Sequence, residues 1–312
     1  MVLAIKVEDV VKTFGKVVAL NRVSFSLPKG CILGYLGPNG AGKTTTIRIL
    51  TKLLEPDSGY IELLGHNISD DFESVKHLIG VMSAERTYLL EHMTIERNLK
   101  LFGRLYGLSG RELERRINEL LDLLDLKEHR NKRIYELSRG LKVRSSLCRA
   151  LINSPEILFL DEPTSGIDIL HAQRIRNYIK EISRKGTTIF LATHNMHEAQ
   201  QLSDYLAFLD KGRLLAYGEA ESILRKFSPI EKVVKIKCSE PRVLLERLLE
   251  EGYDVEEFSN EVIVKLKSNY DLNYLLTKIT SIVKVYSIST MEPSLEKVFK
   301  SFYKRSRGVV EE

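Results

Sequence analysis

Residues 37–46 read GPNGAGKTTT, a stretch that combines three glycines with one lysine and a run of threonines. The glycines let backbone N–H groups turn inward around an oxyanion, because no Cβ stands in the way. Lys43 adds a cation for phosphate, and Thr44 adds a hydroxyl that Mg²⁺ accepts as a ligand. The β-rich run CILGYL precedes this stretch and the helical run TTIRILTKLL ends it. The sequence therefore predicts a nucleotide-binding P-loop between a strand and a helix.

Two adjacent acids end the apolar run ILFLDEP, about 120 residues beyond the glycine-rich stretch. Asp161 can hold a magnesium ion, usually through water, which leaves Glu162 free to polarise an attacking water molecule. The simpler interpretation is that the two acids cap the end of a strand. The P-loop in the same chain favours the catalytic interpretation.

The composition is that of a globular chain without a membrane span. Of the 312 residues, 43% are hydrophobic and 29% are charged, and no apolar run approaches the roughly 18 residues that a span needs. The N-terminus lacks a charged-then-apolar leader, so we expect no secretory signal. Three widely spaced cysteines, Cys31, Cys148 and Cys238, predict reduced, buried side chains in a cytoplasmic protein.

The net charge of +5 is modest, and the basic stretches mix acids with bases at helical spacing. This pattern favours a solvated helix face over a nucleic-acid-binding patch, so we expect no nucleic-acid partner.

Residues 1–227 read as an α/β unit, because β-rich runs such as TTIFLAT alternate with amphipathic helical runs. The first 30 residues alternate apolar and polar side chains, which predicts an antiparallel edge beside a mostly parallel core sheet. Residues from about 88 to 150 are leucine-rich and mostly helical, so we expect an inserted helical subdomain.

The composition changes near Pro229, and residues 228–312 predict a small α+β domain. Its expected elements alternate in the order of a ferredoxin-like fold. These are strands at 233–238, 253–258, 261–267 and 284–289, and helices at 241–250, 271–283 and 294–305.

The segment LSRGL, residues 137–141, resembles the Leu-Ser-Gly-Gly-Gln signature of ATP-binding cassette (ABC) ATPases. Ser138 and Gly140 precede a predicted helix, whose N-terminus suits an anion. In the family, that anion is the γ-phosphate held by the P-loop of the other protomer. Arg139 and Leu141 depart from the signature, whereas the serine and the following glycine, which would touch phosphate, remain.

Three further matches follow the family's pattern. SGID, residues 165–168, resembles the loop at the dimer seam, with Asp168 as its acid. His194 follows a strand where the family places a histidine that contacts the γ-phosphate, although a lone histidine could simply cap a strand. Phe14 stands where the family stacks an aromatic ring on adenine, although it could equally belong to the core.

One element of the family pattern is missing from this chain. After IGVMS the family usually has a glutamine that reaches the metal, and this chain has Ala84 and Glu85. Our hypothesis is that Glu85 takes over as a Mg²⁺ ligand. The alternative, that this loop has lost its sensor role, carries equal weight.

The resemblance implies an ATPase that uses ATP and Mg²⁺, in which catalysis falls to Lys43, Glu162 and His194. It assigns Mg²⁺ to Thr44 and Asp161, with Glu85 as the further candidate. The implied ATP contacts are Phe14, Gly37, Pro38, Asn39, Gly40, Ala41, Gly42, Lys43, Thr44, Thr45, Ser138, Gly140 and Asp168.

The resemblance also implies partners. Two cassettes would pair as a homodimer, or as a heterodimer with a second cassette, on the cytoplasmic face of a membrane and against a separately encoded permease. The tail segment EPSLEKVF looks like the ending of cassettes that serve export-type permeases. A cassette that acts on ribosomes or DNA is the first alternative, and an unrelated P-loop kinase or GTPase is the second.

Overall fold

The computed structural model describes residues 2–83, 87–227, 232–258, 261–266, 272–291 and 295. Its central element is a six-stranded sheet in the order β10-β9-β3-β8-β7-β6. Strands β3, β9, β8, β7 and β6 run parallel, and β10 is antiparallel to β9. The bounds are β3 Ile32–Leu36, β6 Ile79–Ser83, β7 Ile157–Asp161, β8 Thr188–Thr193, β9 Tyr205–Asp210 and β10 Arg213–Glu219.

The register of the parallel strands brings their carboxyl ends to one edge of the sheet. Leu36 at the end of β3 pairs with Thr193 of β8, and Asp161 of β7 pairs with Ser83 of β6. Every residue of β3, β7 and β8 is buried, which explains their nearly continuous apolar sequences. Loops that leave this edge can therefore place side chains close together.

The antiparallel strands form a sheet of their own, in the order β2-β1-β4-β5. Its strands are β1 Leu3–Phe14, β2 Val17–Pro28, β4 Ser58–Leu63 and β5 His66–Asn67. The predicted antiparallel strands are thus confirmed, but they pair with β4 and not with the parallel sheet. Apolar residues of both sheets share one core, in which the rings of Phe25 and Tyr35 lie 5.6 Å apart.

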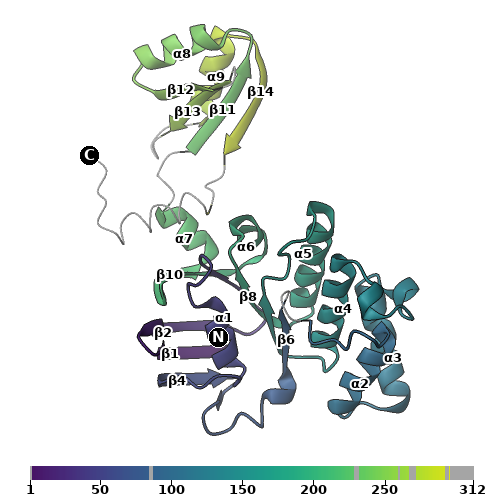
Figure 1. Cartoon of the computed structure of the whole chain (residues 1–312). Coiled ribbons are helices and arrows are strands. Elements are labelled where there is room, and N and C mark those ends of the chain that lie inside the picture. Colours follow the sequence, from purple (N-terminus) through teal and green to yellow (C-terminus); the bar gives the residue numbers. More distant parts are fainter. Residues whose placement is uncertain are drawn as a thin grey trace. The chain divides into compact units, whose positions relative to one another are not determined.

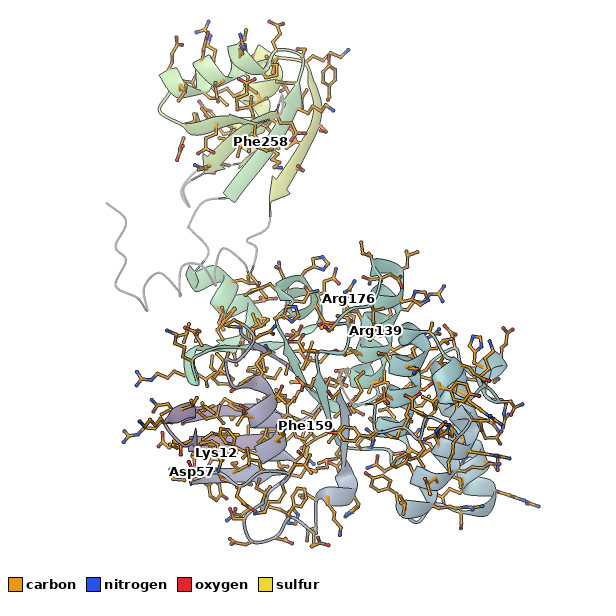
Figure 2. All side chains as sticks on the ribbon, in the orientation of Figure 1. Lys12, Asp57, Arg139, Phe159, Arg176 and Phe258 are labelled. Carbon is orange, nitrogen blue, oxygen red and sulfur yellow. The ribbon has the colours of Figure 1, made fainter. Side chains whose placement is uncertain are left out.

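A carboxylate ties β1 to the turn before β4. Asp57 accepts hydrogen bonds from the ammonium of Lys12 at 2.7 Å and from the backbone N–H of Thr13 at 2.6 Å (Figure 2). The bond from Lys12, together with those from Thr13, lowers the pKa of Asp57 to about 2. This contact fixes the end of β1, which finishes at Phe14 before the chain turns into β2.

The helical part predicted for residues 88–150 is built from α2 Ile95–Leu105, α3 Gly110–Leu123 and α4 Arg139–Leu151, which group on one side of the parallel sheet (Figure 1). Short 3-10 turns lie at Lys76–Leu78, Lys127–His129 and Ile134–Glu136. Buried leucines of α3 and α4 share a core with α5, Ile169–Arg184. The outer face carries ion pairs such as Lys100 with Glu96 and Glu114, as expected for a solvated face.

The chain divides into two compact units, Met1–Ala220 and Glu221–Glu312, so the division falls at the start of α7, Ala220–Phe227. The composition of the sequence suggested a boundary after residue 227. Helix α1, Lys43–Leu50, and helix α6, Met196–Leu202, complete the first unit. In the described part of the chain, no helix is both long and apolar enough to cross a membrane.

The second unit contains an antiparallel sheet in the order β12-β13-β11-β14, with α8 and α9 against one face (Figure 1). Its elements are β11 Lys232–Cys238, α8 Pro241–Glu250, β12 Asp254–Phe258, β13 Glu261–Leu266, α9 Leu272–Ile282 and β14 Val285–Met291. This βαββαβ order confirms the ferredoxin-like prediction. The boundary residue Pro229 and the helix predicted at 294–305 lie outside the described residues, apart from Leu295.

All three cysteines are free. Cys148 and Cys238 are buried as predicted, whereas Cys31 is only half-buried because it lies at the exposed turn before β3.

Candidate active site

The glycine-rich loop joins β3 to α1, and two of its glycines are required by close contacts. A Cβ at Gly37 would lie 2.3 Å from the carbonyl oxygen of Leu209 on β9. Gly42, the residue before α1, has φ +113, and a Cβ there would meet the carbonyl oxygen of Ala19 at 2.6 Å. Backbone and neighbouring strands therefore leave no room for a side chain.

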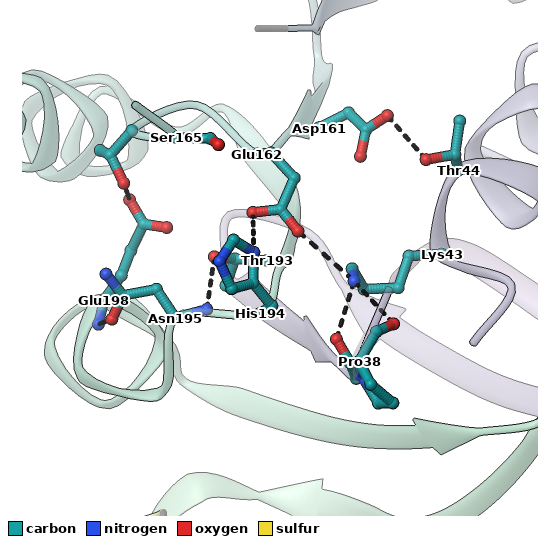
Figure 3. Close-up of polar contacts among 12 residues, drawn as sticks. Pro38, Lys43, Thr44, Asp161, Glu162, Ser165, Thr193, His194, Asn195 and Glu198 are labelled. Atoms are coloured by element: carbon teal, nitrogen blue, oxygen red, sulfur yellow. Dashed lines mark hydrogen bonds and ion pairs between the residues drawn. The ribbon is translucent and has the colours of Figure 1, made fainter. Parts of the chain in front are cut away.

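Lys43 is 6% exposed, and its ammonium lies inside the loop that precedes it. It donates hydrogen bonds to the carbonyl oxygens of Gly37 at 2.7 Å and Pro38 at 3.2 Å. It also lies 3.4 Å from a carboxylate oxygen of Glu162 (Figure 3). A cation is thus fixed at the positive end of α1, where an anion gains from both charges.

Two oxygen groups face each other beside the lysine. The hydroxyl of Thr44 donates to Oδ2 of Asp161 at 3.0 Å, and Asp161 is 8% exposed (Figure 3). A hydroxyl and a carboxylate are the hard oxygen donors that Mg²⁺ takes when phosphates and water complete its coordination. The residues present therefore fit a magnesium ion.

The carboxylate of Glu162 lies between the Lys43 ammonium and the His194 ring. One oxygen faces the Lys43 ammonium, and the other lies 2.7 Å from Nδ1 of His194 (Figure 3). The sequence predicted both residues separately, and the structure brings them into hydrogen-bond contact. A carboxylate in this position can accept a proton from a water molecule.

The backbone of Glu162 is left-handed, with φ +53, although the residue is not glycine. Its N–H donates to the carbonyl oxygen of Ala192 at 2.9 Å. A left-handed conformation costs such a residue roughly 1–3 kcal/mol, and it persists only where neighbouring contacts impose it. Such strain is concentrated at functional sites.

A pocket of about 400 Å³ opens over Lys43, Thr44, Asp161 and Glu162. Its lining combines loop residues with the two acids and includes four positions that sequence reasoning missed: Val17, Val18, Ala19 and Ser83. Ser83 ends a parallel strand beside Asp161, so the strand-end rule could have found it. Phe14 is not among the lining residues, and at 50% exposure it does not belong to the core.

The signature residues lie at the start of α4. The hydroxyl of Ser138 accepts from the N–H of Leu141, and Gly140 is buried against the ring of His171. Asp168 caps α5 and accepts hydrogen bonds from both the backbone and the ring of His171, which lower its pKa. None of Ser138, Gly140 and Asp168 lines the pocket in the described part of the chain.

Two residues near the site were not assigned a role from sequence. Arg139 donates to the carbonyl oxygen of Ser165 at 2.9 Å. Glu198 on α6 is completely buried and accepts a hydrogen bond from the Thr164 hydroxyl at 2.8 Å (Figure 3). No local spacing could have revealed these contacts, because each joins residues that are distant in the sequence. Ala84 and Glu85, the candidates for the missing glutamine, lie outside the described residues.

The doubly wound parallel sheet and a P-loop with paired acids at its carboxyl edge define a P-loop nucleoside triphosphatase. Comparison with known proteins narrows this class. A family described as ABC transporter matches residues 20–165. The chain is 38% identical over 220 residues to a daunorubicin resistance ATP-binding protein of Streptomyces coeruleorubidus, covering 70% of this chain and 69% of that protein.

Two further relatives extend the comparison. A linearmycin resistance ATP-binding protein of Bacillus subtilis is 31% identical over 302 residues, covering 95% of this chain and 96% of that protein. The dimeric structure of a bacterial ABC transporter cassette superposes with a TM-score of 0.64 at 26% identity, covering 69% of this chain and 98% of that chain. The chain belongs to the ABC transporter ATP-binding proteins and is an ATPase. These relatives do not favour a cassette that acts on ribosomes or DNA.

Proposed function

We propose that this ATPase drives a separately encoded membrane permease of export type, from the cytoplasmic face of the membrane. Support comes from the relatives named as daunorubicin and linearmycin resistance ATP-binding proteins, since an ATPase that powers export of a compound would make the cell resistant to it. The transported compound would be chosen by the membrane helices of the permease.

Within one chain, the loop residues 37–45 would bind the ATP phosphates, with Lys43 as the fixed cation. Thr44 and Asp161 would hold Mg²⁺, which neutralises phosphate charge when bound. Glu162 would accept the proton of the attacking water, and His194 would contact the γ-phosphate while holding Glu162 through its 2.7 Å contact. Val17 and Val18 offer an exposed apolar surface for adenine, close in sequence to Phe14.

The second half of the site would come from a partner cassette. The single observation that carries this proposal is that the P-loop pocket is lined by Lys43, Thr44, Asp161 and Glu162 and lacks Ser138 and Gly140 among its described lining residues. Ser138, which is exposed at the start of α4, would then be available to the γ-phosphate of a second copy. The dimeric cassette that this chain resembles supports such pairing, as a homodimer or with a second cassette.

ATP would close the two cassettes on each other, and hydrolysis would let them open, so that the permease alternates between two states.

The second unit, Glu221–Glu312, presents no group of three or more metal-binding side chains in its described part. The simplest role for it is structural; strengthening the dimer, regulating it and binding the permease are the alternatives.

The Glu162→Gln variant tests this account. The amide keeps the size of the side chain but cannot accept the proton, so the variant binds ATP, hydrolyses it at least a hundredfold more slowly, and accumulates as a dimer. Size-exclusion chromatography with light scattering, in ATP and in ADP, measures this outcome.

A variant that stays monomeric in saturating ATP would contradict the shared site. The matched control is the unmodified chain in ATP, which turns over and returns to monomer. Purification from membranes tests the partner: an integral membrane protein should copurify, whereas recovery of ribosomes would contradict the transport role.

A further inference from the structure

Arg139 is out of place by local rules. It is the first residue of α4, where the helix dipole disfavours a cation. Among the described residues, its guanidinium forms no ion pair with a carboxylate. Instead it donates to the carbonyl oxygen of Ser165, 2.9 Å away, in the loop that follows Glu162. A residue that breaks a local rule needs a compensating contact, and this hydrogen bond is that contact.

Gly166 makes room for this guanidinium. It has φ +66, and a Cβ built on it would lie 2.6–2.8 Å from three atoms of the Arg139 guanidinium. Any other residue at 166 would push the arginine off Ser165. This chain has Arg139 where the signature has a glycine, and the absence of a side chain at Gly166 leaves space for the larger arginine.

The contact continues from Ser165 to the catalytic acid. The N–H of Ser165 donates to the carbonyl oxygen of Glu162 at 3.1 Å, which closes a turn over residues 162–165. Glu162 is held in its left-handed conformation at one end of this turn. Two hydrogen bonds therefore connect the Arg139 side chain to the backbone of Glu162.

We propose that Arg139 is a positioning residue for the Glu162 of its own chain, and not a contact for the ATP that its signature turn serves on the partner. This inference rests on the proposed shared site. By holding Ser165, Arg139 keeps the turn closed and the Glu162 carboxylate aimed between Lys43 and His194. Without it, ATP still binds, but the base is less often in position.

A mixture of two inactive chains tests which site Arg139 serves. One chain carries Ser138→Leu, an uncharged block of the signature, and keeps its P-loop and Glu162. The other carries Lys43→Met, which fills the volume of the buried lysine without its charge, and keeps its signature. Only one site can work in the mixed dimer, and it combines Glu162 of the first chain with Ser138 of the second.

Arg139→Ala is then added to either chain. On the chain that supplies Glu162, it should lower kcat about tenfold with little change in the KM for ATP, as expected when a charge-assisted hydrogen bond that orients a base is lost. On the chain that supplies the signature, it should have no effect. Arg139→Lys, which keeps a cationic N–H donor, should lower kcat less.

Arg133→Ala is the matched control, because Arg133 is an exposed arginine of the same region that donates to the hydroxyl of Tyr135. It should leave turnover unchanged on either chain. An effect of Arg139→Ala only on the signature chain would overturn the inference and assign Arg139 to the partner's phosphate. The absence of any effect would also overturn it. If the mixture in which both chains keep Arg139 shows no activity, the result contradicts the proposed shared site itself, and this outcome can be told apart from the others.

Discussion

Glu198 shows how a residue outside the pocket can belong to the site. Its carboxyl group is completely buried and accepts from Thr164 in the loop after Glu162 (Figure 3). The hydroxyl of Thr193, the residue before His194, acts on the pKa of the same carboxyl group. Glu198 therefore connects the segment that carries Glu162 with the segment that carries His194. Burial is the main cause that raises its pKa, and the hydrogen bonds from both threonines oppose the shift.

The raised pKa predicts a pH dependence of stability. Above the ordinary value of 4.5, the unfolded chain loses this proton while the folded chain keeps it, so the free energy of unfolding falls as pH rises toward the raised pKa. Glu198→Gln cannot ionise, and its stability relative to the unmodified chain should rise across the same range. Urea unfolding of both proteins between pH 4.5 and pH 8 measures the difference. Parallel pH curves would contradict this explanation.

Where the role of a single residue depends on spacing, the sequence is enough to propose it. Lys43 and Thr44 follow from the loop pattern, and Asp161 and Glu162 follow from their place after an apolar strand. The partner of Arg139 could not be predicted, because a long side chain can reach many acceptors and only the folded loop presents the carbonyl of Ser165 to it.

At the scale of elements, the site depends on how the loop between β3 and α1 passes β9. Gly37 lies against the backbone of Leu209, which cannot move without breaking the pairing of β9 with β10. Gly40, in the same loop, has open space around it and needs glycine only because its φ is +79. The two glycines therefore differ in why they are required.

This difference predicts that replacement by alanine lowers the free energy of unfolding by different amounts at Gly37 and Gly40. Gly37→Ala should lower the free energy of unfolding by about 3 kcal/mol or more, since a Cβ 2.3 Å from a carbonyl oxygen displaces a strand. Gly40→Ala should cost about 1 kcal/mol, the penalty of a left-handed alanine. Chemical denaturation of the two variants compares them directly. Equal costs would contradict a constraint from β9 on residue 37, which has no left-handed backbone of its own to account for a cost.

The strands themselves were largely predictable, but their assembly into sheets was less so. Alternating residues identify β1 and β2 as half-buried antiparallel strands, yet alternation does not say which strand pairs with them. Their partner β4 lies beyond α1 in the sequence, and only the folded chain places it beside β1. The antiparallel region is consequently a second sheet and not an edge of the first.

At the scale of the whole molecule, the chain consists of two units with separate cores. The first unit contains every candidate site residue that the structure describes. It holds one P-loop pocket with its acids and one signature turn, which does not line that pocket. Under the proposed function, one chain would carry two different halves of a site, and a symmetric pair of chains would carry two whole ones.

Complementation between two inactive chains tests this central claim most directly. Lys43→Met and Ser138→Leu chains should each hydrolyse almost no ATP alone. Mixed in equal amounts, they should regain about a quarter of the unmodified rate, since half of the pairs are mixed and each has one of two sites intact. The account would be contradicted if the mixture were as inactive as each variant alone while the unmodified chain hydrolysed ATP at full rate as a monomer.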